Sequence, residues 1–325
     1  MKKKTLFLSL LILIYVITGC TNTQTVLKEE RTIKFYFQDG APALTVAKLL
    51  EDNPSLSPYI HIEYEMEKSP DLLVTRILKE EADIAIVPSN LAATAYNKGL
   101  PYKIAGTATW GSFYLTSTED IRGYGDLKGK EIYSFGKGLT PDLVLRYVLS
   151  ENGIDPDKDV NINYLNAASE VGPMFLSGKT NLALLAEPLL TTVMMKKSDA
   201  KVILDLNEEW SKAADVKNGF PQASIIIKNE LIDEDWEFVD KFLDAYEGSR
   251  LWAEENLEDL SLLAEEQGIG VLKETIEKGI IWNNLESFHI KDCKGEYEAY
   301  YNAIMDFEPE FIGGEHPDEG IYLQR

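Results

Sequence analysis

The residue best placed to do chemistry lies at the end of an apolar run. Residues 182–190 read LALLAEPLL, so Glu187 follows five apolar positions and directly precedes Pro188. Proline is common in the first turn of a helix, and a carboxylate near that turn stabilises its unpaired amides. Two interpretations of Glu187 stay open: it caps a helix, or it points into a ligand site at the carboxyl end of a strand.

Motifs of the common enzyme classes are absent or misplaced in the sequence. The stretch GPMFLSGKT, residues 172–180, has five residues between its glycines where a phosphate-binding loop has four. Its second glycine is better explained as a helix end. Neither G-x-S-x-G nor H-E-x-x-H occurs, and the histidines at 61, 289 and 316 are widely separated. We therefore expect no enzymatic activity, no metal site and no cofactor.

The first twenty residues have the features of an export signal. Lysines at positions 2–4 precede an apolar run, residues 6–17, which is shorter than the ~20 residues that a membrane-spanning helix needs. The sequence ITGC at 17–20 resembles the lipobox of bacterial lipoproteins. We expect residues 1–19 to be a signal peptide, Cys20 to carry the lipid, and residues 20–31 to form a tether. Ordinary secretory cleavage is the alternative, but no A-x-A pattern supports it.

Composition narrows the function further. The chain of 325 residues contains 54 acidic and 32 basic residues, a formal charge of -22, which argues against a nucleic-acid partner. An apolar fraction of 45% is typical of a globular protein, and the length allows one large or two medium cores. Cys293 is the only cysteine besides Cys20, so acylation of Cys20 leaves no pair for an internal disulfide.

Strand-like and helix-like segments alternate along the chain and must position these residues. The alternation predicts an α/β fold with sheets covered on both faces. A long extended segment at 102–118 suits a crossover between two lobes, and the chain reads as helical from Trp236 onward. The predicted strands are 33–37, 60–65, 83–87, 131–135, 160–165, 181–186 and 201–206, with a returning strand at 223–228.

These features together resemble the substrate-binding lipoproteins of ABC importers, in the group that handles nitrate, aliphatic sulfonates, taurine and pyrimidine precursors of thiamine. The matching stretches are the lipobox at Cys20 and residues 78–106, 126–138, 174–188 and 308–318. The resemblance implies a two-lobed periplasmic-binding-protein-like fold of type II. Each lobe would hold a mainly parallel sheet flanked by helices, followed by a helical C-terminal region. Lobe I would comprise residues 32–106 plus 223–325, and lobe II residues 107–222.

The same resemblance implies a ligand site between the lobes. By position in the family, the site would use the loop after the first strand, a helix start, the crossover and loops of lobe II. The expected ligand-binding residues are Gln38, Asp39, Gly40, Ser89, Asn90, Thr107, Trp110, Phe135, Gly136, Lys137, Asn166, Glu187 and Phe220. Each also has a structural alternative as a core, capping or solvated residue. The first loop, FYFQDGAPA at 35–43, departs from the tryptophan-rich or proline-rich pattern of many relatives.

The expected charges favour one kind of ligand. Asp39 and Glu187 oppose an anion, whereas Lys137 is the only cation expected in the site. Carboxylates with three expected aromatic residues suit a flat, nitrogen-bearing ring such as a pyrimidine. A cationic amine, or a sulfonate-type or taurine-type anion at helix N-termini, are alternatives.

The resemblance also implies partners and a location. We expect a lipid-anchored monomer on the outer face of the cytoplasmic membrane that delivers a small organic nutrient to ABC permease and ATPase subunits. An enzyme or a sensor on the same fold is the competing class.

Overall fold

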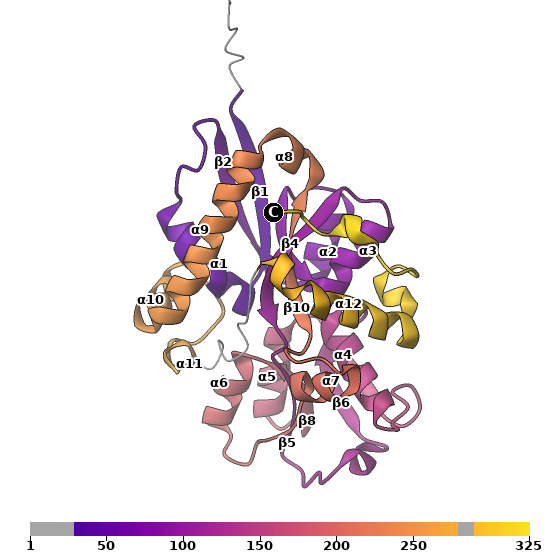
Figure 1. Cartoon of the computed structure of the whole chain (residues 1–325). Coiled ribbons are helices and arrows are strands. Elements are labelled where there is room, and N and C mark those ends of the chain that lie inside the picture. Colours follow the sequence, from indigo (N-terminus) through magenta and orange to yellow (C-terminus); the bar gives the residue numbers. More distant parts are fainter. Residues whose placement is uncertain (1–28, 279–288) are drawn as a thin grey trace, which may run out of the picture.

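The computed structural model describes residues 29–278 and 289–325. The expected signal peptide and Cys20 lie outside the described residues, so both remain predictions. The described chain folds around two sheets, one above the other in the view of Figure 1.

The first sheet has the strand order β2-β1-β3-β10-β4. Its strands are β1 (Arg31–Gln38), β2 (Ile60–Glu67), β3 (Ile84–Pro88), β4 (Tyr102–Trp110) and β10 (Pro221–Lys228). β1 pairs in parallel with β2 and β3, whereas β10 is antiparallel to β3 and β4. Four strands therefore point the same way and β10 points the other.

The second sheet repeats this arrangement, with the order β7-β6-β8-β5-β9. Its strands are β5 (Phe113–Ser117), β6 (Glu131–Phe135), β7 (Asn161–Leu165), β8 (Leu182–Ala186) and β9 (Lys201–Asp205). β6 is parallel to β7 and β8, and β5 is antiparallel to β8 and β9. The expected α/β class, with mainly parallel strands in each half, is confirmed.

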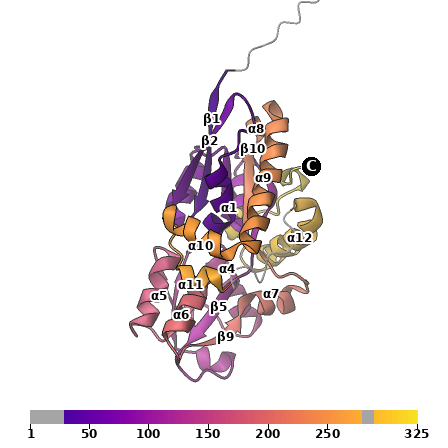
Figure 2. The same cartoon turned by 90° about the vertical axis from the view of Figure 1, so that its left-hand side faces the viewer.

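Helices cover both faces of the first sheet because its strands alternate apolar residues between two cores. Phe35 and Phe37 face the core under α1 (Ala41–Asp52) and α9 (Trp236–Glu255), and Tyr36 faces the opposite core. α10 (Leu257–Glu266) packs on α1, and α8 (Asn229–Glu234) leads into α9 (Figure 2). The other face carries α2 (Pro70–Leu78), α3 (Ser89–Asn97) and α12 (Ile290–Phe307).

Two pairs of helices flank the second sheet. α5 (Ala168–Leu176) packs on α6 (Leu189–Lys196), and α4 (Thr140–Glu151) packs on α7 (Leu206–Ala214). α11 (Lys273–Glu277) contacts α6, and α12 contacts α7, so C-terminal elements reach the second half on both sides. Short 3-10 helices are η1 (Tyr124–Leu127), η3 (Pro309–Ile312) and η4 (Glu319–Ile321). The expected helical C-terminal region is confirmed in the described residues.

Two adjacent chain segments connect the sheets. β4 leaves the first sheet after Trp110, and β10 enters it at Pro221, the residue paired with Trp110. Between them the Gly111 N–H donates to the Phe220 carbonyl at 3.0 Å. A Cβ at Gly111 would lie 2.1 Å from the Asn207 side chain, so only glycine fits this crossing. The crossover segments are thus bound to one another where they pass between the halves.

Candidate functional site

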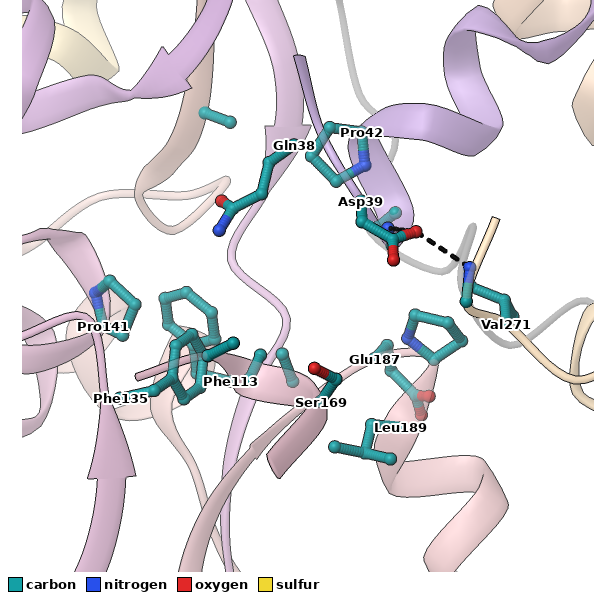
Figure 3. Close-up of a pocket in the computed structure, with 18 of the residues that line it drawn as sticks. Gln38, Asp39, Pro42, Phe113, Phe135, Pro141, Ser169, Glu187, Leu189 and Val271 are labelled. Atoms are coloured by element: carbon teal, nitrogen blue, oxygen red, sulfur yellow. Dashed lines mark hydrogen bonds between the residues drawn. The ribbon is translucent and has the colours of Figure 1, made fainter. Parts of the chain in front are cut away.

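A cavity of about 340 Å³ lies between the two sheets (Figure 3). Its lining comes from the carboxyl ends of β1, β3, β6 and β8 and from the first residues of α1, α4, α5 and α6. Ligands of open α/β sheets bind at this position, outside the carboxyl ends of the strands.

Apolar and aromatic side chains form much of the wall. Phe113 and Phe135 meet edge to face, with ring centroids 6.0 Å apart. Phe220 stacks behind Phe113 at 5.8 Å and is itself fully buried. Pro42 lies across the cavity from these two lining rings (Figure 3). A flat apolar group can therefore pack between the halves.

Glu187 lines the second-sheet side of the cavity and is 6% exposed. Its carboxylate accepts hydrogen bonds from the Thr191 backbone N–H at 3.2 Å and from the Thr191 hydroxyl at 3.1 Å. Burial raises the pKa of this carboxyl, and the Thr191 hydrogen bonds oppose that rise. The hydrogen bonds support the capping interpretation, although α6 begins at Leu189, after the proline. Contact with a ligand stays a prediction.

Asp39 lies on the first-sheet side, opposite Glu187 (Figure 3). One carboxylate oxygen accepts from the N–H groups of Gly40 and Gly270, both at 2.8 Å. The other oxygen accepts from the Lys68 ammonium at 2.9 Å, and Lys68 also donates to the Gly268 carbonyl at 3.0 Å. The Asp39–Lys68 pair therefore ties the 268–270 turn to the end of β1, and the Asp39 carboxylate already has a cationic partner.

The cations of the cavity differ from the expected one. Lys68 and Lys196 line it, whereas Lys137 does not. The Lys137 ammonium instead lies 5.4 Å from the centre of the Tyr164 ring. The segment between β2 and α2, which holds Lys68, and the end of α6, which holds Lys196, thus bring two lysines to the lining that sequence reasoning did not place there, and contact of Lys137 with a ligand stays a prediction.

Five of the predicted ligand-binding residues line the cavity. They are Gln38, Asp39, Gly40, Phe135 and Glu187. The Gln38 amide points into the cavity, on the side of Phe135 and Pro141 (Figure 3). Whether these residues contact a ligand remains a prediction.

The other predicted residues do not line the cavity: Ser89, Asn90, Thr107, Trp110, Gly136, Lys137, Asn166 and Phe220.

Three of these eight have structural partners in the core. The Ser89 hydroxyl lies 2.7 Å from that of Ser224, and the Thr107 hydroxyl lies 3.2 Å from that of Tyr297. Trp110 is 2% exposed and packs in the core. These residues lie in or directly after the strands from which they were expected to reach the site, but their side chains point toward α12 or the core.

Asn90 does not line the cavity but connects the two halves. Its amide nitrogen donates to the carbonyls of Gly138 and Phe311, each at 3.0 Å, and its oxygen accepts from the Thr140 hydroxyl at 3.2 Å. Asn90 thus joins α3 of the first half to the start of α4 in the second. Asn166, by contrast, is exposed, and its N–H donates to Glu170 at 3.1 Å.

Sequence reasoning missed several lining residues. Pro141 and Ser169 sit in first turns of helices that follow strands, the same signal that pointed to Glu187. Gln222 lies at the start of the returning strand, which was assigned only to chain crossing. Val271 and Leu272 carry no local signal, because the Asp39 contact to Gly270 is made over a separation of 231 residues.

The architecture defines a type II periplasmic-binding-protein fold, with two α/β halves and a cavity between them. Residues 60–258 match the family described as NMT1/THI5 like, and this match covers more than half of the sequence. The chain therefore belongs to the NMT1/THI5-like family.

A curated protein is similar to part of the chain. YtlA of Bacillus subtilis (strain 168), which carries the name of a binding protein, is 27% identical over 194 residues. That match covers 57% of this chain and 54% of YtlA, so it spans about half the length of the curated relative.

Solved structures share the fold over most of the chain. An ABC transporter protein from Parabacteroides distasonis superposes with a TM-score of 0.72 at 29% identity, covering 90% of this chain and 99% of that one. The alkanesulfonate-binding protein SsuA of Xanthomonas axonopodis pv. citri gives 0.67 at 15% identity, covering 85% and 93%. The nitrate-binding protein NrtA of Synechocystis PCC 6803 gives 0.60 at 16%, covering 80% and 74%.

Proposed function

We propose that this protein is an extracytoplasmic solute-binding protein of an ABC import system. The observation that carries the proposal is the cavity between two α/β halves, at the carboxyl ends of the strands, in a chain of this family. Closure of the two halves around a ligand would present the loaded form to permease and ATPase subunits. The names of the sulfonate-binding, nitrate-binding and ABC transporter proteins that share the fold support this role.

The proposed ligand is a nitrogen heteroaromatic compound such as a pyrimidine. Phe113 and Phe135 offer ring faces and edges, with Phe113 taking the place expected for Trp110 and Phe220. Glu187, a buried carboxyl with no cationic partner among the described residues, can accept from an amino group or, when protonated, donate to a ring nitrogen. An uncharged aromatic ring with polar atoms at its edge can both pack against these phenylalanines and hydrogen-bond to Glu187.

A small anion is the second candidate, and two observations favour it. The first turns of α1, α4, α5 and α6 converge on the cavity, and helix N-termini favour negative charge. Lys196 also lines the cavity, and no ion pair of its ammonium is present in the described part of the chain. Against an anion, Lys68 is occupied by Asp39, and the buried Glu187 carboxyl would repel negative charge whenever it is ionised.

Binding is proposed in preference to catalysis. Within residues 29–278 and 289–325, no group of three His, Cys, Asp or Glu side chains is arranged to hold a metal. The same residues contain no helix that is long and apolar enough to cross a bilayer. We propose that Cys20 carries the lipid that holds the monomer at the outer face of the cytoplasmic membrane.

Thermal unfolding tests the function directly. Residues 21–325 are heated alone and with pyrimidines, thiamine precursors, flavins, polyamines, taurine and alkyl sulfonates. A ligand at about a hundred times its dissociation constant adds about 2.7 kcal/mol to the free energy of unfolding. A shift with one heteroaromatic compound supports the proposed ligand, and a shift with sulfonates alone supports the second candidate. The absence of any shift across small nutrients of all these classes would contradict solute binding.

A further inference from the structure

Gln222 has an amide whose orientation is fixed by the crossover. It is the second residue of β10, is partly buried and lines the cavity. Its side-chain oxygen accepts from the Ser112 backbone N–H at 2.8 Å and from the Ser112 hydroxyl at 3.1 Å. A backbone N–H can only donate, so the amide atom that faces Ser112 must be the oxygen.

In this orientation the amide nitrogen of Gln222 can still donate hydrogen bonds. The nitrogen carries two N–H groups, and it has no hydrogen-bond partner in the described part of the chain. The oxygen is already engaged by two donors from the crossover. The polar group that Gln222 offers to the cavity is therefore a hydrogen-bond donor and not an acceptor.

Ser112 connects this donor to Glu187. While its N–H and hydroxyl donate to Gln222, its carbonyl oxygen accepts from the Glu187 backbone N–H at 3.0 Å. Ser112 lies between β4 and β5, next to the bond from Gly111 to Phe220. One crossover residue thus positions a donor from the first sheet and a carboxyl from the second relative to each other.

We propose that Gln222 is a specificity-determining residue that donates a hydrogen bond to an acceptor atom of the ligand. This inference rests on the proposed function and narrows its ligand to an uncharged ring that carries a ring nitrogen or carbonyl acceptor. Ser112 is the positioning residue that keeps the Gln222 nitrogen turned toward that acceptor. A site built in this way rejects analogues without the acceptor, because a bound analogue would cover the donor and leave it unpaired.

Two probes that differ in the acceptor test the proposal. 4-Aminopyrimidine and aniline both carry an amino group on a six-membered ring, but only the former has ring nitrogens. Binding of each to residues 21–325 is measured by calorimetry. We expect the wild-type chain to bind 4-aminopyrimidine at least ten times more tightly than aniline. Equal affinities in the wild-type chain, or binding of neither probe, would overturn the proposal.

Gln222→Glu is the decisive variant because it keeps an oxygen for Ser112 and removes the amide donor. We expect the preference for 4-aminopyrimidine to fall at least tenfold, with a far-ultraviolet spectrum unchanged from wild type. Gln222→Leu, which lacks the donor without adding charge, should lose the preference as well. An unchanged preference in either folded variant would overturn the role of Gln222.

Ser112 variants test the positioning role. Ser112→Ala removes one of the two donors that hold the Gln222 oxygen, so the preference for 4-aminopyrimidine should fall by a few fold. Ser112→Thr restores the hydroxyl and should restore the preference, and Ser177→Ala on the exposed end of α5 should change nothing. If the Ser112 variants do not change the preference in this way, the inference is rejected. Solute binding itself would still stand if thermal unfolding finds a ligand of another class.

Discussion

At the scale of single residues, Glu187 combines two demands in one side chain. It caps the start of α6 through Thr191, and it also lines the cavity. The burial that suits the cap therefore also changes the acid–base chemistry of a group that faces the ligand space. A carboxyl removed from water prefers its neutral form, which can donate as well as accept a hydrogen bond.

The raised pKa of Glu187 predicts a pH-dependent stability. The folded chain retains the Glu187 proton at pH values above the ordinary pKa of 4.5, which the group has in the unfolded chain. The contribution of this proton to stability is therefore complete below pH 4.5 and is lost as the pH rises through the pKa of the folded state. Glu187→Gln keeps an oxygen for Thr191 and has no proton to lose. The free energy of unfolding of this variant, measured by urea denaturation, should therefore increase relative to that of the wild-type chain as the pH rises from 4.5 to 8. A difference that is constant with pH would contradict the assigned pKa shift.

Removal of the carboxyl should affect binding more than folding. Glu187→Ala deletes the proposed polar partner of the ligand, and we expect affinity to fall at least tenfold. The cap costs about 1 kcal/mol, which leaves the chain folded at room temperature. Calorimetric titration and circular dichroism report the two effects separately. Wild-type affinity in the variant would leave Glu187 with its capping role alone.

The sequence predicted the end of β8 and its acidic residue but not the direction of every neighbouring side chain. Ser89 directly follows β3 and Trp110 is the last residue of β4. The Ser89 hydroxyl nevertheless hydrogen-bonds to Ser224, and the Trp110 side chain lies in the core. Residue type and strand position do not distinguish the two faces near a strand end. Only contacts with distant elements such as β10 and α12 make that choice.

At the scale of elements, strands were more predictable than cavity walls. Residues 131–135 form β6 as predicted, and 201–206 form β9 with one residue fewer. The extended segment at 102–118 is two strands, β4 and β5, separated by Gly111 and Ser112. Local periodicity sets the strands, whereas the 268–272 loop reaches the cavity through Asp39, and no local pattern encodes that contact.

The contact between α5 and α6 gives an element-scale prediction. A Cβ at Gly172 would lie 2.6 Å from the Leu189 side chain, at the start of the helix that follows Glu187. Gly172→Ala should therefore cost about 1–3 kcal/mol through overpacking. Gly248→Ala in α9 is the matched control, since nothing lies within 4 Å of its Cβ, and it should be neutral or stabilising. Urea denaturation of both variants measures the contrast, and equal stabilities would refute this packing argument.

At the scale of the whole molecule, the two halves are joined on both sides of the cavity. The hydroxyls of Thr192 and Thr275 lie 2.8 Å apart between α6 and α11. On the other side Asn90 bonds to the Gly138 carbonyl. These bonds, together with the paired crossover, hold the halves against each other around the cavity.

The proposed lipid anchor predicts where the molecule is found in cells. Cys20→Ser removes the only thiol that the lipobox offers, so the protein should leave the membrane fraction and appear in the soluble one. Cys293→Ser is the matched control, because this buried thiol is 3.3 Å from the Thr107 hydroxyl and far from the leader in sequence. Fractionation followed by immunoblotting reads both variants. Retention of Cys20→Ser on membranes would reject the anchor.

The most direct measurement of the central claim is thermal unfolding of a chain whose cavity is filled. Ser169 is exposed and lines the cavity, so Ser169→Trp should occupy the ligand space without disturbing the core (Figure 3). Ser177→Trp places the same side chain at the far end of α5, outside the cavity. With the compound that stabilises wild type, Ser177→Trp should keep the full shift and Ser169→Trp should lose it. An equal shift in both variants would show that the ligand binds elsewhere and that this cavity is not the solute site.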